Sequence, residues 1–176
     1  MGETNVHVAI FAKTPRKGEV KTRLIPELGA AGALKAHMEL LQKTLTNLSI
    51  ASVDARFELW VTSYSQSVQD CADQHGLVLK MQLGESLGER MKNAMGSMFV
   101  NGADLAFIVG SDCPELNSDY LRMMIHKSSE QDLLLAPAED GGYCLIGSRV
   151  FIRNYSQALS GVKPRSLSKL FPRPVL

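Results

Sequence analysis

The protein has 176 residues, of which 45% are hydrophobic and 21% charged, and its formal net charge is +1. This length and apolar fraction predict one domain with its own core. No run reaches the roughly 18 apolar residues of a membrane span, and the N-terminus lacks a secretory-signal pattern, so we expect a cytoplasmic protein without a membrane partner. The three cysteines are widely spaced, which argues against a disulfide framework or a zinc site.

The charge is unevenly distributed along the chain. Residues 149–176 carry six cations and no acid, whereas residues 1–148 hold thirteen cations against eighteen acids, a net charge of −5. Because the body is acidic, we expect no nucleic-acid partner, although a local phosphate site is allowed. We expect residues 1–148 to form the folded domain and residues 149–176 a divergent basic tail.

Apolar runs alternate with helical patterns along the chain. We expect strands over residues 6–12, 57–62, 77–83, 105–109, 132–136 and 143–146. We expect helices over residues 30–48, 65–75, 86–100 and 117–127. This order predicts an α/β fold with a mostly parallel sheet and helices on both faces. Loops at the carboxyl ends of such strands carry function.

A strongly basic loop follows the first strand. In A-K-T-P-R-K-G-E-V-K-T-R-L, residues 12–24, five of thirteen residues are basic and Glu19 is the single acid. Crowded cations repel one another unless an anion is bound, and polyphosphate is a common partner of Lys and Arg. Gly18 allows close approach of backbone to a ligand. A solvated basic turn explains the same residues, and the stretch is not a Walker A loop.

Two acidic loops follow later strands. Asp112, in G-S-D-C-P, comes after the strand over residues 105–109, where a rigid carboxylate can hold Mg²⁺ beside substrate phosphates. A turn or helix cap is the alternative for Asp112. The A-E-D-G-G stretch, residues 138–142, also fits an ordinary hairpin turn. One cationic loop and two acidic loops at strand ends together indicate group transfer from a nucleotide donor.

A fourth stretch, G-E-S-L-G-E-R-M at residues 84–91, contains an S-x-x-E capping box. Gly88 lies near the predicted helix start, where backbone N–H groups can contact an anion or a base. Arg90 lies in the first turn, where the helix dipole disfavours a cation. A bound ligand and an ion pair with Glu85 would each account for Arg90.

These four segments, in this order, resemble the bacterial DUF2064 family. F-A-K-T-P-R-K-G-E-V-K-T-R-L is similar to its F-A-K-x-P-x-x-G-x-V-K-T-R-L opening, and G-E-S-L-G-E-R-M to its G-x-x-L-G-x-R-M segment. G-S-D-C-P and A-E-D-G-G-Y-C-L-I-G are similar to G-x-D-x-P and P-A-x-D-G-G-Y-x-L-I-G. The resemblance covers residues 5–148. It implies a Rossmann-like three-layer α/β/α fold of the glycosyltransferase-A type, that of nucleotide-diphospho-sugar transferases and of molybdenum-cofactor and phospholactate nucleotidyltransferases.

The resemblance also implies roles for individual residues. The nucleotide and its phosphates would be bound by Lys13, Gly18, Lys21, Arg23, Gly88 and Arg90. A catalytic Mg²⁺ or Mn²⁺ would be held by Asp112 and Asp140, with Lys21 completing the catalytic set. Gly141 and Gly142 would line the acceptor side.

The function implied is metal-dependent transfer from a nucleoside triphosphate or sugar nucleotide to a small-molecule acceptor. Attack at the α-phosphorus would give nucleotidyl transfer, and attack at the sugar carbon glycosyl transfer. Similar proteins continue with an acidic segment that often supplies a second metal carboxylate, whereas residues 149–176 contain no acid. We therefore expect a shortened C-terminal part, which leaves a non-catalytic nucleotide-binding or partner-binding protein as the alternative. A homodimer is left open.

Overall fold

The computed structural model describes residues 4–48, 53–138 and 142–151 of the chain. The strands are β1 (Val6–Ala12), β2 (Arg56–Val61), β3 (Val78–Met81), β4 (Leu105–Gly110), β5 (Leu133–Pro137) and β6 (Tyr143–Ser148). The helices are the short 3-10 helix η1 (Thr22–Leu24), α1 (Ile25–Leu48), α2 (Gln66–Gln74), α3 (Leu87–Val100) and α4 (Ser118–Lys127). The predicted tail beyond residue 151 lies outside the described residues, so the proposed domain division stays a prediction.

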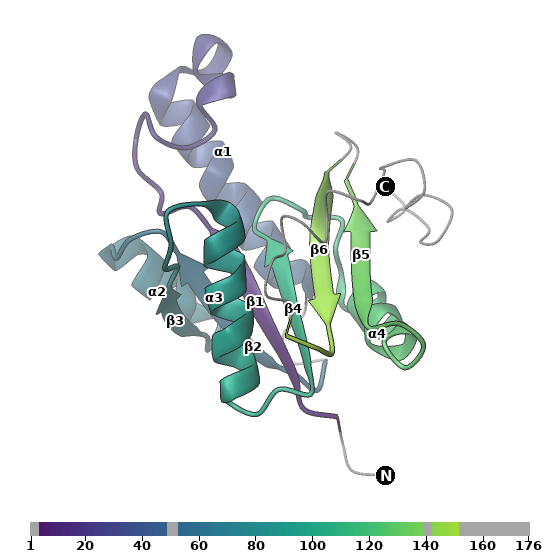
Figure 1. The fold of residues 1–176 in the computed structure, drawn as a ribbon. Helices are drawn as coiled ribbons and strands as arrows, with labels where there is room; N and C mark the ends of the chain where they lie inside the picture. Colours follow the sequence, from purple (N-terminus) through teal and green to yellow (C-terminus); the bar gives the residue numbers. More distant parts are fainter. Residues whose placement is uncertain (1–3, 49–52, 139–141, 152–176) are drawn as a thin grey trace.

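The strands form one sheet in the order β3-β2-β1-β4-β6-β5 (Figure 1). Strands β3, β2, β1 and β4 are parallel, whereas β6 is antiparallel to both β4 and β5. Strand β5 therefore runs in the same direction as β4, and the carboxyl ends of β1 to β5 meet at one edge. The predicted mostly parallel sheet is confirmed, and that edge is where ligands bind in open α/β sheets.

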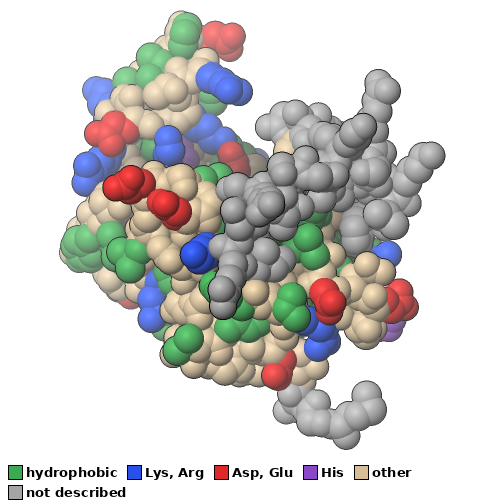
Figure 2. Space-filling model, in the orientation of Figure 1, with side chains coloured by type: hydrophobic (Ala, Val, Ile, Leu, Met, Phe, Trp, Pro, Cys, Tyr) green, Lys and Arg blue, Asp and Glu red, His purple; other side chains and the backbone are tan. Residues whose placement is uncertain are grey.

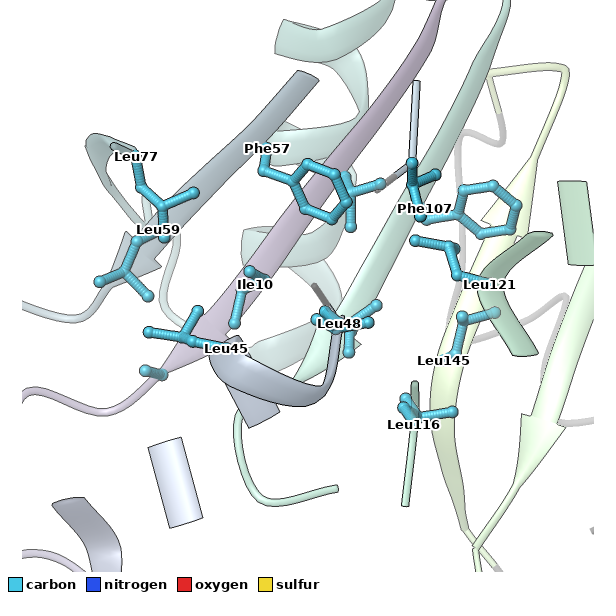
Figure 3. Packing of buried hydrophobic residues seen from close by; sticks show 14 of the residues in the cluster. Ile10, Leu45, Leu48, Phe57, Leu59, Leu77, Phe107, Leu116, Leu121 and Leu145 are labelled. Carbon is cyan, nitrogen blue, oxygen red and sulfur yellow. The ribbon is translucent and has the colours of Figure 1, made fainter. Parts of the chain in front are cut away.

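One face of the sheet is covered by α1, α2 and α4. All seven positions of β1 are buried, as expected for a central strand with both faces covered. Ile10 and its alternate neighbours point into this face, where Leu45 and Leu48 of α1 and Leu121 of α4 are almost fully buried (Figure 3). These apolar contacts fix α1 against β1, β2 and β4.

The other face is covered by α3, which is seen in front of the sheet in Figure 1. Met91, Met95 and Met98 of α3 are buried against it, as expected for methionines at helical apolar spacing. Phe11 and Trp60 stack beside them with ring centroids 6.2 Å apart. Helices therefore lie on both faces, and the three-layer α/β/α architecture is confirmed.

The α3 face also carries a polar cluster, which we call the His7–Glu58 cluster, in which His7, Glu58 and Trp60 are buried and Arg56 is exposed. The side chain of Glu58 is only 5% exposed; it forms an ion pair with Arg56 Nε at 3.2 Å and accepts a hydrogen bond from Trp60 Nε1 at 3.0 Å. His7 is buried, and its Nδ1 has no hydrogen-bond partner among the described residues. Burial and the neighbouring Arg56 charge lower the pKa of His7, against an opposing effect of Glu58.

Helix α1 begins five residues earlier than the sequence pattern predicts. Gly29 interrupts it with φ 68° and ψ 168°, a conformation that glycine adopts without the steric cost of a Cβ. The continuous helix thus starts after Gly29, where the prediction placed it, and Ile25–Leu28 is a separate turn. Among the described residues, no helix combines the length and hydrophobicity that crossing a membrane requires.

Candidate functional site

The basic loop leaves β1 through a buried threonine. The Thr14 backbone N–H donates to Thr62 Oγ1 at 3.1 Å, and its hydroxyl donates to the Ser63 carbonyl. The Ser63 N–H returns a hydrogen bond to Thr14 Oγ1 at 2.8 Å. These bonds attach the start of the basic loop to the segment that follows β2.

A tight turn shapes the middle of the basic loop. The Glu19 N–H donates to the Arg16 carbonyl at 3.0 Å, and Gly18 has φ 86° at the third position of this turn. A Cβ placed on Gly18 would meet nothing within 4 Å. The structure therefore explains Gly18 by the backbone conformation of the turn, and a close approach to a ligand there stays a prediction.

Lys21 lies in the left-handed region, with φ 46° and ψ 42°, the one non-glycine residue with positive φ in the described part of the chain. This conformation costs about 1–2 kcal/mol for a residue with a Cβ. The Lys21 carbonyl accepts from the Leu24 N–H at 2.8 Å, which begins η1. Its ammonium meets Asp112 Oδ2 at 2.7 Å, so the loops after β1 and β4 are joined by an ion pair.

Asp112 follows β4, and its side chain is 52% exposed. Partial burial raises the pKa of the carboxyl, but the Lys21 hydrogen bond and charge, the Asp112 backbone N–H and nearby His37 together lower it below its ordinary value. The carboxylate is therefore ionised at neutral pH. Helix α4 is capped by Asn117, whose side chain accepts from the Tyr120 N–H at 2.9 Å, so Asp112 is not the helix cap.

Three of the predicted phosphate-binding residues, Lys13, Lys21 and Arg23, line one hollow of about 380 Å³. The other lining residues are Glu19, Thr22, Leu24 and Leu40. Together with Asp112, these three cations form what we call the Lys21–Asp112 site. Figure 2 shows Lys and Arg side chains gathered at the upper left of the molecule, over the segment that carries the basic loop in Figure 1.

Helix α1 holds both loops of the site by their backbone carbonyls. His37 Nε2 donates to the Lys13 carbonyl at 2.9 Å, and Thr44 Oγ1 donates to the Ser111 carbonyl at 3.2 Å. One turn further, Asn47 Nδ2 donates to the Pro114 carbonyl. Sequence analysis missed these residues, although His37 and Thr44 could have been noticed as polar residues beside the apolar stripe of this helix.

The residues present fit a hard divalent cation that is shared with a substrate. The Asp112 carboxylate is ionised and already has one cationic group, the Lys21 ammonium, on Oδ2. Within residues 4–48, 53–138 and 142–151, no group of three or more His, Cys, Asp or Glu side chains could hold a metal ion. Mg²⁺ commonly binds proteins through one or two carboxylates plus substrate phosphates, so Asp112 suits a site that the donor completes.

The β5–β6 hairpin reaches the same edge of the sheet as Asp112. Pairing of Val109 with Leu145, and of Pro137 with Tyr143, carries this hairpin past the end of β4. The Ala138 N–H donates to the Gly142 carbonyl at 3.0 Å, which closes the loop as the hairpin interpretation predicts. Gly142 is exposed, whereas Asp140 and Gly141 lie outside the described residues, so their roles stay predictions.

Gly88 and Arg90 lie in the first turn of α3, at the carboxyl end of β3. The predicted capping box is confirmed, because Ser86 and Glu89 exchange both side-chain-to-backbone hydrogen bonds. Arg90 Nε donates to the Gly84 carbonyl at 2.9 Å, so its guanidinium holds its own turn rather than Glu85. The structure does not join Arg90 to the basic loop within the described residues, and a role in nucleotide binding stays a prediction.

Cys113 is half-buried beside Asp112, and its thiol donates to Asp112 Oδ1 at 3.9 Å. The nearby Cys144 thiol, burial and the charges of Asp112 and Glu115 raise the pKa of the Cys113 thiol. A thiol with a raised pKa is a poor nucleophile, so Cys113 is best explained as a small packing residue.

The family profile described as "Uncharacterized protein conserved in bacteria (DUF2064)" matches residues 44–164. The chain belongs to the DUF2064 family. The predicted membership of this family is confirmed, and the profile match covers three of the four motifs that resemble it, from G-E-S-L-G-E-R-M onward. No curated protein matches the sequence.

Several solved structures with the same fold are named as transferases or synthases. A protein from Desulfovibrio desulfuricans G20, provisionally named a nucleotide-diphospho-sugar transferase, is 29% identical with a TM-score of 0.74 over 84% of this chain, which spans 64% of that protein. A cytidylyltransferase from Leptospira borgpetersenii is 16% identical, with a TM-score of 0.58 over 97% of this chain and 70% of that one.

A third structure is glucosyl-3-phosphoglycerate synthase from Mycobacterium tuberculosis in complex with Mg²⁺ and UDP. It is 9% identical, with a TM-score of 0.56 over 83% of this chain and 57% of that one. At these identities the second and third structures establish the fold only. The DUF2064 protein therefore has the fold of nucleotidyl and glycosyl transferases.

Proposed function

We propose that this DUF2064 protein is a metal-dependent transferase that moves a nucleotidyl or glycosyl group from a nucleotide donor to a small-molecule acceptor. The observation that carries the proposal is the 2.7 Å contact between Lys21 and Asp112, which joins a cationic hollow to an ionised carboxylate at the carboxyl ends of adjacent strands. The names of the structural relatives, and the Mg²⁺ and UDP in one of them, support the same chemistry.

The donor phosphates would be held by Lys13, Lys21 and Arg23. Charge-assisted hydrogen bonds to phosphate oxygens are among the stronger polar contacts in proteins. The hollow of about 380 Å³ is within the size range of small-molecule sites, and its lining residue Lys21 contacts Asp112 of the β4 loop. The phosphates of a nucleoside triphosphate or a sugar nucleotide would relieve the repulsion among these three cations.

Asp112 would hold Mg²⁺ or Mn²⁺, with Asp140 as the proposed second carboxylate. When bound, the ion would neutralise developing charge on the donor phosphates and the leaving group. The chain itself would supply positioning: Lys13, Lys21 and Arg23 orient the phosphates, and α1 fixes the two loops through their carbonyls. Polar groups fixed before substrate binding need little reorganisation during the reaction.

The remaining predicted residues divide between the two substrates. Gly88 and Arg90, at the start of α3, would lie near the nucleotide, and Gly141 and Gly142 would line the acceptor side. The hairpin register carries the ends of β5 and β6 past the end of β4, the strand that precedes Asp112, and this supports the acceptor assignment. A cytoplasmic location also stays a prediction.

A thermal-shift panel of nucleoside triphosphates and sugar nucleotides, with and without Mg²⁺ or Mn²⁺, tests the proposal. A donor at about 100 times its dissociation constant adds ~2.7 kcal/mol to the unfolding free energy. We expect metal-dependent stabilisation by at least one nucleotide, its loss in Asp112→Asn, and its retention in Glu115→Gln, which removes a nearby exposed carboxylate. A folded wild type that no nucleotide stabilises would contradict the proposal.

A second candidate, a non-catalytic nucleotide-binding protein, is supported by the lack of a three-residue metal-ligating group within the described residues. Turnover separates the two candidates once the donor is known. Release of pyrophosphate or a nucleoside diphosphate, lost in Asp112→Asn but not in Glu115→Gln, supports the transferase. Tight nucleotide binding without either product across an acceptor panel supports the binding protein.

A further inference from the structure

We propose that Lys21 is a built-in counter-cation of Asp112. Binding of a divalent cation to Asp112 would release Lys21 for the donor phosphates, and binding of the phosphates to Lys21 would release Asp112 for the cation. The inference rests on the proposed function, because it concerns how the same site is loaded. It assigns Lys21 two alternative positions, one on the Asp112 carboxylate and one on the donor phosphates.

The first observation is the position of the Lys21 ammonium. It is 2.7 Å from Asp112 Oδ2, and the Lys21 side chain also lines the cationic hollow with Lys13 and Arg23. One group therefore reaches both the carboxylate and the predicted phosphate position. The Lys21 side chain is 25% exposed, so solvent and ligands have access to it.

The second observation is that the Lys21 ammonium already occupies Asp112 Oδ2, so a divalent cation would compete with it for this oxygen. Two cations held directly on Oδ2 would lie within a few ångströms of each other, where like charges repel strongly even near a protein surface. A divalent cation bound at Asp112 Oδ2 therefore requires Lys21 to move away from this oxygen. The lysine side chain has a flexible four-carbon stem, so its ammonium can move while the backbone stays in place.

The third observation is the backbone of Lys21. Its left-handed conformation aims the side chain at the β4 loop, although a glycine would suit φ 46° better. Strained residues of this kind persist where surrounding contacts over-determine them, and they cluster at ligand sites. The Leu24 N–H holds the Lys21 carbonyl, so we expect the backbone geometry to survive loss of the ion pair.

Linkage gives the functional consequence. A polyphosphate that attracts Lys21 vacates Asp112 Oδ2 for the metal, and a metal on Asp112 releases Lys21 for the phosphates. The coupling must be equal in both directions. Without ligands, the ion pair neutralises Asp112 and reduces its attraction for stray cations.

The test measures each ligand alone, so that metal–nucleotide complexes do not interfere. Mn²⁺ binding is followed by electron paramagnetic resonance and inorganic pyrophosphate binding by calorimetry, in wild type and in Lys21→Met. An ion pair of this exposure is worth about two- to fivefold in affinity. We expect Lys21→Met to bind Mn²⁺ about two- to fivefold more tightly and pyrophosphate more weakly, so the two affinities change in opposite directions.

Lys13→Met is the matched control, because it removes the same charge from the same loop and leaves the Lys21–Asp112 ion pair in place. We expect it to weaken pyrophosphate binding while changing Mn²⁺ affinity less than Lys21→Met does. Adding Asp112→Asn to Lys21→Met should abolish the gain in Mn²⁺ affinity. If Lys21→Met fails to fold, Lys21→Gly, which suits φ 46°, replaces it.

Two results would overturn the inference. One is unchanged or weaker Mn²⁺ binding in Lys21→Met; the other is an equal gain in Lys13→Met, which would indicate only a general field effect. Mn²⁺ binding that needs Asp112 but is insensitive to Lys21 refutes the counter-cation while leaving the proposed function intact. Mn²⁺ binding that is unaffected by Asp112→Asn refutes the proposed metal site itself.

Discussion

Two of the ion pairs in the described part of the chain, Lys21–Asp112 and Arg56–Glu58, differ mainly in the burial of the carboxylate. At the Lys21–Asp112 site the carboxylate side chain is 52% exposed, whereas in the His7–Glu58 cluster it is 5% exposed. Glu58 has a second partner, Trp60 Nε1, in the protein interior. Asp112 is half-exposed, and its Oδ2 accepts from Lys21, which lines the cationic hollow with Lys13 and Arg23.

This difference shows how similar residues serve stability in one place and ligand binding in another. A buried carboxylate is costly unless every partner is present, so the His7–Glu58 cluster is an internal requirement of the fold. An exposed pair contributes about 0.2–1 kcal/mol and can be exchanged for a ligand at little cost. The comparison therefore predicts that mutations in the two regions affect different measurements.

The largest effect on stability is expected for Glu58→Ala. This change leaves the indole N–H of Trp60 buried without its acceptor and removes the partner of Arg56. We expect a loss of about 1–3 kcal/mol in chemical denaturation, with ligand-induced shifts unchanged. Glu58→Gln, which keeps an acceptor for the indole, should lose less; an equal loss in both variants would mean that the hydrogen bond is not the cause.

A smaller effect is expected for Thr44→Val in α1. The variant is similar in shape but leaves the Ser111 carbonyl without the hydroxyl donor that holds the β4 loop. We expect a loss of about 1 kcal/mol and weaker nucleotide-dependent stabilisation, since Asp112 follows Ser111 directly. Thr46→Val, on the exposed side of the same helix, is the control and should change neither quantity. Full retention of the ligand effect in Thr44→Val would show that this tether does not position Asp112.

Asp112→Asn should change the stability of the ligand-free protein still less. The ion pair with Lys21 is half-exposed, and its contribution is within about 0.2–1 kcal/mol after screening by solvent. The same variant should abolish the metal-dependent shift. A ligand-free loss well above 1 kcal/mol would place Asp112 with Glu58 as a structural carboxylate and remove the contrast between the two regions.

The smallest effect is a change in pH dependence at His7. Its pKa in the folded protein is lowered from 6.5, so below pH 6.5 the unfolded chain binds a proton that the folded protein does not. Proton uptake at His7 in the unfolded chain therefore lowers the free energy of unfolding as the pH falls below 6.5, and it has little effect above that pH. We expect His7→Gln to flatten the stability profile between pH 7.5 and 5, with exposed His126→Gln as a control that keeps the wild-type slope.

Much of the fold could be predicted from the sequence because its signals are local. Continuous apolar runs over residues 6–12 and 105–109 identified the central strands, and the S-x-x-E box identified the start of α3. The sequence predicted a helix that begins at residue 30, directly after Gly29, and this agrees with the position of the break in α1. The additional turn before it was not predicted, because Ile25–Leu28 is too short for periodicity to register.

The site could be predicted only in part. The motifs placed Lys13, Lys21, Arg23 and Asp112 on loops at strand ends, and the structure brings these four together. The direct ion pair was not predictable, because it depends on the left-handed backbone of Lys21 rather than on residue type. Arg90 illustrates the same limit: a cation in a first helical turn suggested a ligand or Glu85, and its actual acceptor is a backbone carbonyl.

The break at Gly29 divides α1 into a short turn, Ile25–Leu28, and a continuous helix that follows Gly29. Beyond Gly29 the helix runs along the sheet and holds the carbonyls of Lys13 and Ser111 through His37 and Thr44, whereas the turn before it projects past the sheet edge (Figure 1). A residue outside helical geometry interrupts the backbone hydrogen-bond ladder. Amide hydrogens of the last turns of α1 should therefore exchange slowly and those before Gly29 quickly. We therefore expect the turn before Gly29 to open more readily than the rest of α1, without disturbing the core.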